Sequence, residues 1–147
     1  MMKQLLIMSL IVFQNAISQN NPEQLTKEFI KEYKVWNDLA FQLDQDKNPS
    51  ASSLAEKSYK ELIQKYCDKN KVYQFLAFGS NSLHSPEEEI VTKTKIKHNK
   101  AIVSTRFKDK NFDYLINYYE YHFVLIDGKW LLEEVYLIDE DGKYPGL

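Results

Sequence analysis

The sequence predicts an α+β fold in which N-terminal helices pack on a curved antiparallel sheet. In the first half of the chain, apolar residues recur at intervals of three and four, which is the period of an amphipathic helix. From about Glu89 onward, apolar and polar residues alternate, which is the period of a half-buried strand. The 147 residues, 44% of them hydrophobic, suffice for one domain with one core and are too few for two ordinary domains.

The N-terminus has the features of an export signal. A basic start at Lys3 leads into the apolar run 5–13 and then into small residues, which is the order of a secretory signal peptide. The run is far shorter than the ~20 apolar residues that cross a bilayer as a helix. We therefore expect residues 1–18 to be a signal peptide and residues 19–147 to be one exported domain, periplasmic or secreted, without a membrane span. An uncleaved anchor in the membrane interface is the alternative.

The first helix is predicted to begin after Asn21. Asn21 can cap it, Pro22 fits the first turn, and Gln24 can reach back to the capping backbone. Apolar side chains then share one helical face over about five turns: Leu25, Phe29, Tyr33, Trp36, Ala40 and Leu43. The segment 44–53 is rich in Asp, Asn, Pro and Ser, which favour turns, so we expect a loop there.

The second helix is predicted to begin at Ser53, because Ser53 and Glu56 have the spacing of a capping box. It should end near Asn70. Its apolar stripe consists of Leu54, Tyr59, Leu62, Ile63 and Tyr66. The one cysteine, Cys67, cannot form an internal disulfide. We expect a small buried apolar side chain there; a reactive thiol and an intermolecular disulfide are the alternatives.

The second half of the chain begins with a predicted hairpin. Isoleucine and threonine alternate mainly with lysine over residues 90–97, so we expect the face of Ile90 and Ile96 to be buried. His98-Asn99 is expected to reverse the chain, because asparagine tolerates positive φ. A second strand over 101–107 then completes the hairpin.

A second hairpin is predicted after the polar loop 109–113. The runs 114–126 and 130–138 are rich in β-branched and aromatic residues. Asp127-Gly128 stands between them, and Asp-Gly between two such runs is a strong hairpin signal.

Several short strings in these elements resemble the immunity branch of the nuclear transport factor 2-like fold, which has the same order of two helices and a long-stranded sheet. The strings are Trp36-Asn37, Tyr66-Cys67, Phe78-Gly79, His84-Ser85-Pro86-Glu87-Glu88-Glu89-Ile90, Ala101-Ile102-Val103-Ser104-Thr105, Gly128-Lys129-Trp130-Leu131-Leu132 and Asp141-Gly142-Lys143-Tyr144. The resemblance implies a cystatin-like cone and a protein that neutralises a secreted polymorphic toxin by binding it. Many such immunity proteins are cytoplasmic, so an export signal would fit a toxin that acts in the cell envelope.

His84 and the glutamates after it allow three interpretations. His84 and Glu88 have the four-residue spacing that lets two side chains on a helical turn hold a metal or exchange a proton. Two ligands fall short of the three or four of most metal sites, so we expect no metal. Ser85 and Pro86 could instead open a capped turn. The third interpretation is an exposed acidic rim for a basic partner, formed by His84, Glu87, Glu88 and Glu89.

The tyrosines of the third predicted strand belong either to the core and its rim or to the mouth of a cavity. Alternation places Tyr119 and Tyr121 on one face and His122 on the other. We take Tyr119 and Tyr121 as candidates for partner contact. The most enzyme-like trio is Tyr119, His122 and Glu134, and the same alternation divides it.

Trp36 and Trp130 are expected to anchor the core, one from the helical half and one from the stranded half. The formal charge is −2, and the lysines are scattered along the sequence among acidic residues, which argues against a nucleic-acid partner. Nucleophilic triads, glycine-rich phosphate loops and paired-cysteine motifs are absent from the sequence. We therefore expect a binding protein without cofactor or catalytic residues. A small-molecule-binding or weakly catalytic cavity protein, an isomerase or hydro-lyase, is the alternative.

Overall fold

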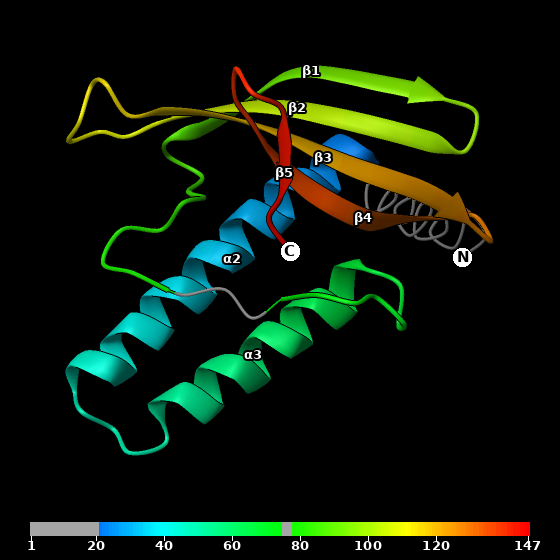
Figure 1. Cartoon of the computed structure of the whole chain (residues 1–147). Coiled ribbons are helices and arrows are strands. Elements are labelled where there is room, and N and C mark those ends of the chain that lie inside the picture. Colours follow the sequence, from blue (N-terminus) through cyan, green and yellow to red (C-terminus); the bar gives the residue numbers. More distant parts are fainter. Residues whose placement is uncertain (1–20, 75–77) are drawn as a thin grey trace, which may run out of the picture.

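The computed structural model describes residues 21–74 and 78–147, and the expected signal peptide lies outside them. Two helices precede five strands: α2 (Pro22–Gln45), α3 (Ala51–Tyr66), β1 (Glu89–Lys97), β2 (Lys100–Lys108), β3 (Ile116–Ile126), β4 (Lys129–Ile138) and β5 (Lys143–Pro145). The strands form one antiparallel sheet in the order β1-β2-β3-β4-β5. Both helices lie on one face of this sheet (Figure 1). The predicted α+β class is therefore confirmed.

Helix α2 begins where the sequence predicted. The side-chain oxygen of its N-cap, Asn21, accepts a hydrogen bond from the backbone N–H of Glu23 at 2.8 Å. The predicted contact of the Gln24 side chain with the capping backbone is wrong, because the Gln24 amide donates to Glu28 at 3.3 Å instead. The predicted apolar face is buried at Phe29, Tyr33, Trp36 and Ala40, and half-buried at Leu25 and Leu43.

Helix α3 begins at Ala51, before the predicted cap. The hydroxyl of Ser53 lies in its first turn and donates to the Ser50 carbonyl at 3.0 Å, so the capping box predicted at Ser53 is wrong. The Asn48 carbonyl accepts a hydrogen bond from Ala51 N–H at 3.0 Å, so a turn over residues 48–51 leads directly into the helix. The helix ends at Tyr66 rather than near Asn70. Its buried face is Ala51, Ala55, Tyr59, Leu62, Ile63 and Tyr66, and Leu54 is exposed.

Strand β1 is an edge strand, and the buried face predicted for it is wrong. Ile90 and Ile96 are 51% and 57% exposed. A bulge between Val91 and Lys93 shifts the register, which places Ile90 and Ile96 on opposite faces of the sheet. Only Glu89 is buried on this strand, and only Val91 is half-buried.

Both predicted hairpin turns are present. Asp127 and Gly128 have φ of 50° and 76°, the pair of positive values that a type I′ turn requires. In the first hairpin the positive φ, 54°, falls on His98 rather than on Asn99. The Asn99 carbonyl instead accepts a hydrogen bond from Leu125 N–H of the neighbouring strand at 2.8 Å.

The core lies between the helices and the inner face of the sheet. Trp36 is buried in it, with its indole N–H donating to the Ala55 carbonyl at 2.9 Å. Trp130 packs against the core from its margin and is partly buried. Cys67, the residue after α3, is buried, and burial raises the pKa of its thiol to about 12. The sheet contributes Ala101, Val103, Thr105, Phe107, Tyr119, Tyr121, Phe123, Leu132 and Val135.

Candidate functional site

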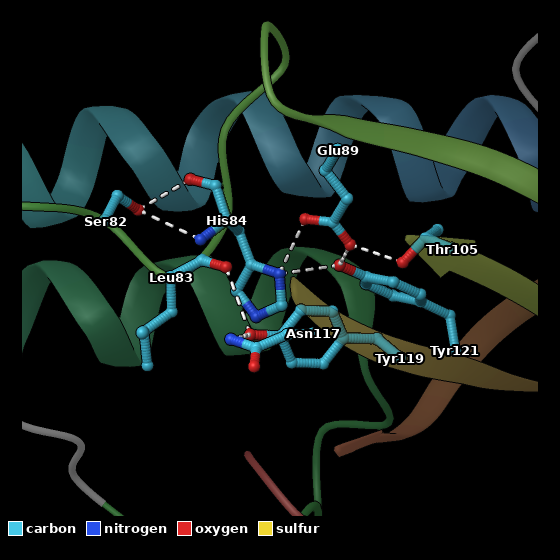
Figure 2. A network of polar contacts seen from close by, with 8 residues as sticks. All are labelled: Ser82, Leu83, His84, Glu89, Thr105, Asn117, Tyr119 and Tyr121. Atoms are coloured by element: carbon cyan, nitrogen blue, oxygen red, sulfur yellow. Dashed lines mark hydrogen bonds and ion pairs between the residues drawn. The ribbon is translucent and has the colours of Figure 1, made fainter. Parts of the chain in front are cut away.

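A cluster of polar side chains lies inside the molecule between α2 and the sheet (Figure 2). Glu89 is the first residue of β1, and His84 comes from the segment that leads into that strand. Thr105 and Tyr121 reach the cluster from the inner faces of β2 and β3. The side chain of His84 is 8% exposed and that of Glu89 is 0% exposed. An imidazole and a carboxylate are therefore enclosed together.

The Glu89 carboxylate has several hydrogen-bond partners. Its Oε2 lies 2.9 Å from His84 Nδ1. Its Oε1 accepts from the Tyr121 hydroxyl at 2.8 Å and from the Thr105 hydroxyl at 2.5 Å. Burial first, and then the charge of Glu89, raises the pKa of Tyr121 well above its ordinary value. The phenol therefore remains a donor, and these bonds offset the cost of burying the carboxylate.

The segment before β1 holds His84 in this position. The Asn37 amide on α2 donates to the Gly79 carbonyl at 2.9 Å and accepts from the Gly79 N–H at 3.0 Å, which fixes the segment to the helix. The Ser82 hydroxyl donates to the His84 carbonyl at 2.6 Å. The imidazole packs against two aromatic rings, with centroid distances of 4.7 Å to Tyr33 and 4.5 Å to Tyr119.

Of the three interpretations of His84, the pairing with Glu88 is wrong. Residues 86–88 form a single turn rather than a helix, in which the Ser85 carbonyl accepts from Glu89 N–H at 2.9 Å. The imidazole therefore meets Glu89. Glu88 points away and its Oε1 accepts from the backbone N–H of Lys110 at 3.0 Å.

The predicted exposed acidic rim is wrong for two of its four members. Glu87 is exposed and Glu88 half-exposed, whereas His84 and Glu89 are buried. The two tyrosines expected to contact a partner, Tyr119 and Tyr121, are buried as well. They lie on the inner face, because the alternation along β3 turns them toward the helices that cover that face.

The enclosed cluster has the groups of a proton-transfer site, since imidazole, carboxylate and phenol are common general acids and bases. Its groups are bonded to one another, however. Of the surface hollows beside it, one is lined by Ser82 and Ser85 and another by Glu89, and neither is lined by His84 or Tyr121. The arrangement therefore serves first to join the start of β1 to β2, β3 and the preceding segment.

The enzyme-like trio is not assembled. Tyr119 lies on the inner face, and its hydroxyl donates to the Leu83 carbonyl at 3.2 Å. His122 Nε2 lies 2.8 Å from a Glu120 oxygen on the other face of the sheet. Glu134 accepts from Lys71 Nζ at 2.8 Å. Within residues 21–74 and 78–147, no three His, Cys, Asp or Glu side chains are grouped so that they could hold a metal ion.

The second candidate site is the outer face of the sheet, opposite the two described helices (Figure 1). The strand registers align one row of side chains across all five strands, which we call the outer row: Ile90, Arg106, Tyr118, Ile138 and Lys143. Ile90 and Tyr118 are each 51% exposed. Large apolar side chains thus flank an exposed guanidinium on this face.

The outer face is also basic. Lys93, Lys95 and Lys97 pair with outward-facing positions of β2, so they share the face of Arg106. None of these four cations forms an ion pair within the part of the chain that the structure describes. We call the three lysines the lysine edge. Sequence reasoning missed this grouping, although alternation along 101–107 would have placed Arg106 opposite the inner residues.

One carboxylate at the centre of the outer face is already neutralised. Glu120 accepts a hydrogen bond from Lys143 Nζ at 2.5 Å and one from His122 Nε2 at 2.8 Å. Burial acts to raise the pKa of Glu120, but these hydrogen bonds outweigh it and hold the pKa below its usual value. The carboxylate therefore does not offset the charge of Arg106 or of the lysine edge.

Comparison with known proteins returns no matching family model, no matching curated protein and no matching solved structure. Neither of the two described helices is long and apolar enough to cross a membrane.

Proposed function

We propose that this chain is a binding protein of the immunity type, which neutralises a secreted bacterial toxin by direct contact. The proposal includes the finer fold assignment, because two helices on one face of a five-stranded meander are compatible with the nuclear transport factor 2-like cone. It also includes export, with residues 1–18 as the signal peptide and a toxin that acts in the cell envelope.

The observation that carries the proposal is the contrast between the two candidate sites. The groups that could catalyse a reaction, His84, Glu89 and Tyr121, are enclosed and bonded to one another. The outer face instead presents half-exposed Tyr and Ile side chains around an exposed arginine. Tyrosine and arginine are enriched among the residues that dominate the affinity of protein interfaces.

The test is capture followed by neutralisation. The full chain is expressed in its own host with a C-terminal tag on a flexible linker, and proteins bound to it are recovered from the envelope and secreted fractions and identified by mass spectrometry. We expect one toxin-like protein in stoichiometric amount, and we expect co-expression of this chain to restore growth to cells that make the toxin. An exported protein of similar size and charge with the same tag is the control.

The linker matters because the chain end is part of the fold. The backbone N–H of Leu147 donates to Glu134 at 2.9 Å, and its carbonyl accepts from Gln74 N–H at 3.3 Å. If no protein is captured, or if the captured protein is harmless and its activity is unaffected by this chain, the immunity proposal is wrong.

The enclosed polar cluster favours a second candidate, a small-molecule-binding or weakly catalytic protein of isomerase or hydro-lyase type. An imidazole oriented by a carboxylate can transfer a proton if a ligand reaches it. His84→Gln and Glu89→Gln would then abolish ligand binding. Native mass spectrometry of the purified protein, showing a retained small molecule that both variants lose, would favour this candidate over the first.

A further inference from the structure

We propose that the outer row and the lysine edge bind an acidic segment of the protein partner, with Arg106 holding a carboxylate of that partner. This inference rests on the proposed binding function and adds the chemistry of the partner and the surface that meets it. The four cations concerned lie on one face of a chain whose formal charge is −2.

Arg106 lies on β2, near the end of the sheet where β1 begins and β4 ends. It lies between Ile90 on β1 and Tyr118 on β3 in the strand registers, and its side chain is exposed. A guanidinium presents donors in a fixed fork that matches the two oxygens of a carboxylate. Apolar neighbours exclude water when a partner covers them, which strengthens such a bond. An unpaired arginine flanked by Ile90 and Tyr118 therefore fits an acidic side chain of a protein.

The size of the outer face suits a protein partner. Strands β1 to β4 have 9, 9, 11 and 10 residues. At ~3.3 Å per residue and ~4.8 Å between strands, the five-stranded face measures roughly 30 by 20 Å. A stable interface buries about 800 Å² of accessible surface on each partner, so one partner would cover this face.

Binding should occur through the face rather than by adding a strand to the β1 edge. The bulge between Val91 and Lys93 interrupts the regular ladder that a new strand would need. Lysines along an edge strand also discourage strand addition. A second copy of this chain is disfavoured too, because a symmetric contact through the outer face would bring the same cations together.

A protein partner is favoured over RNA by the side chains around the arginine. Single-stranded nucleic acid needs exposed aromatic rings on which bases stack. On the outer face, the ring of Tyr136 already packs edge-on against His122 at 4.8 Å, and the neighbours of the arginine are Ile90 and Tyr118. The ring of Tyr118 beside several isoleucines matches the apolar part of a protein interface more closely than it matches a surface on which bases stack.

The first part of the test uses defined probes with the protein purified from expression of the full chain. They are a synthetic peptide of Glu, Leu and Tyr, poly-uridine RNA, and vesicles of phosphatidylglycerol and phosphatidylcholine. Amide chemical shifts in nuclear magnetic resonance spectra locate each probe. We expect the peptide to perturb the outer row and to bind roughly tenfold more weakly to Arg106→Gln.

Two matched variants test whether binding depends on the geometry of the guanidinium and on the position of the positive charge. Arg106→Lys keeps the charge without the fork and should lose part of the affinity. Lys60→Gln removes one positive charge from the exposed side of α3 and should leave binding unchanged. Peptide shifts on the helical side, no shifts at all, or tighter binding of RNA or vesicles than of peptide would each overturn the inference.

The second part of the test uses any toxin captured in the experiment above. If Arg106→Gln captures and neutralises that toxin as well as the unaltered protein does, this surface assignment fails while the immunity function stands. If no toxin is captured but the peptide binds the outer row and requires Arg106, the surface assignment stands and the immunity function fails.

Discussion

The hydroxyl of Tyr121 is a single donor inside the core, and its removal is a direct test of the enclosed cluster. In Tyr121→Phe, Glu89 Oε1 keeps only the bond from Thr105. Leaving a buried acceptor less satisfied costs roughly 1–3 kcal/mol, so we expect the free energy of unfolding to fall by that amount in urea titrations. Tyr118→Phe, at an exposed position on the same strand, should change it by less than about 0.5 kcal/mol. Equal stability of the two variants would contradict the structural role of the cluster.

The two tryptophans should differ in their contribution to stability. Trp36 is buried and loses both its packing and its bond to the Ala55 carbonyl when truncated. We expect Trp36→Ala to cost ~3–5 kcal/mol. Trp130 is only partly buried at the margin of the core, so Trp130→Ala should cost less. Thermal and urea unfolding of both variants decide this, and a reversed order of stability would show that the sheet-side anchor dominates.

The partner of His84 could not be predicted from residue spacing alone. The pairing with Glu88 assumed a helix, in which side chains four residues apart share a face. The chain makes only one turn there before entering β1, and this turn brings Glu89 to the imidazole. Glutamate is almost never fully buried without partners. Those partners, Thr105 and Tyr121, come from strands distant in sequence, so only the folded chain brings them together.

At the scale of the elements, the Asp127-Gly128 turn offers a backbone prediction. Gly128 has φ of 76°, and nothing lies within 4 Å of the position that a Cβ would take. The cost of Gly128→Ala is therefore conformational rather than steric with neighbours, and should be about 1 kcal/mol. Gly128→Asn should cost less, because asparagine tolerates this region. Urea titration of the three proteins would contradict this if alanine and asparagine were equally stable.

The kind of each element was predictable, whereas its buried face was less so. Apolar spacing in α2 and the Asp-Gly signal between β3 and β4 depend on local sequence alone, and both predictions hold. The face of β1 depends on what covers it. A bulge turns Ile90 to the outer face, and Ile96 is exposed on the inner face at the edge of the sheet; neither feature appears in the pattern of residues 90–97.

At the scale of the whole molecule, folding sorts charges that look mixed along the sequence. Lysines of β1 occur at every second residue, so the pleat collects them on one face beside Arg106. The prediction that nucleic acid is not a partner rested on lysines scattered among acidic residues. It remains a prediction, and the poly-uridine arm of the binding test addresses it directly.

The buried phenols predict how the whole fold responds to alkali. Burial raises the pKa of Tyr33 from 10.0 to about 12 and, as the main cause, raises the pKa values of Tyr59, Tyr66, Tyr119 and Tyr121 as well. The raised pKa means that the folded state keeps protons that the unfolded state releases. The contribution of these phenols to the free energy of unfolding is therefore fully present below about pH 10. It is lost as pH rises toward 12 and above, by up to about 1.4 kcal/mol per pH unit for each group.

Phenolate absorbance and circular dichroism, followed together against pH, test this prediction. We expect the part of the phenolate absorbance that comes from the enclosed phenols to appear above pH 10 in one cooperative step that coincides with loss of secondary structure, because these phenols ionise only when the core opens. Tyr33→Phe removes one of these groups and should make the loss of stability with pH shallower. A rise in absorbance that accounts for all ten tyrosines while the circular dichroism is unchanged would mean that hydroxide reaches the buried rings in the folded protein. The space between α2 and the sheet would then be open to solvent, which would favour the cavity function over the outer face.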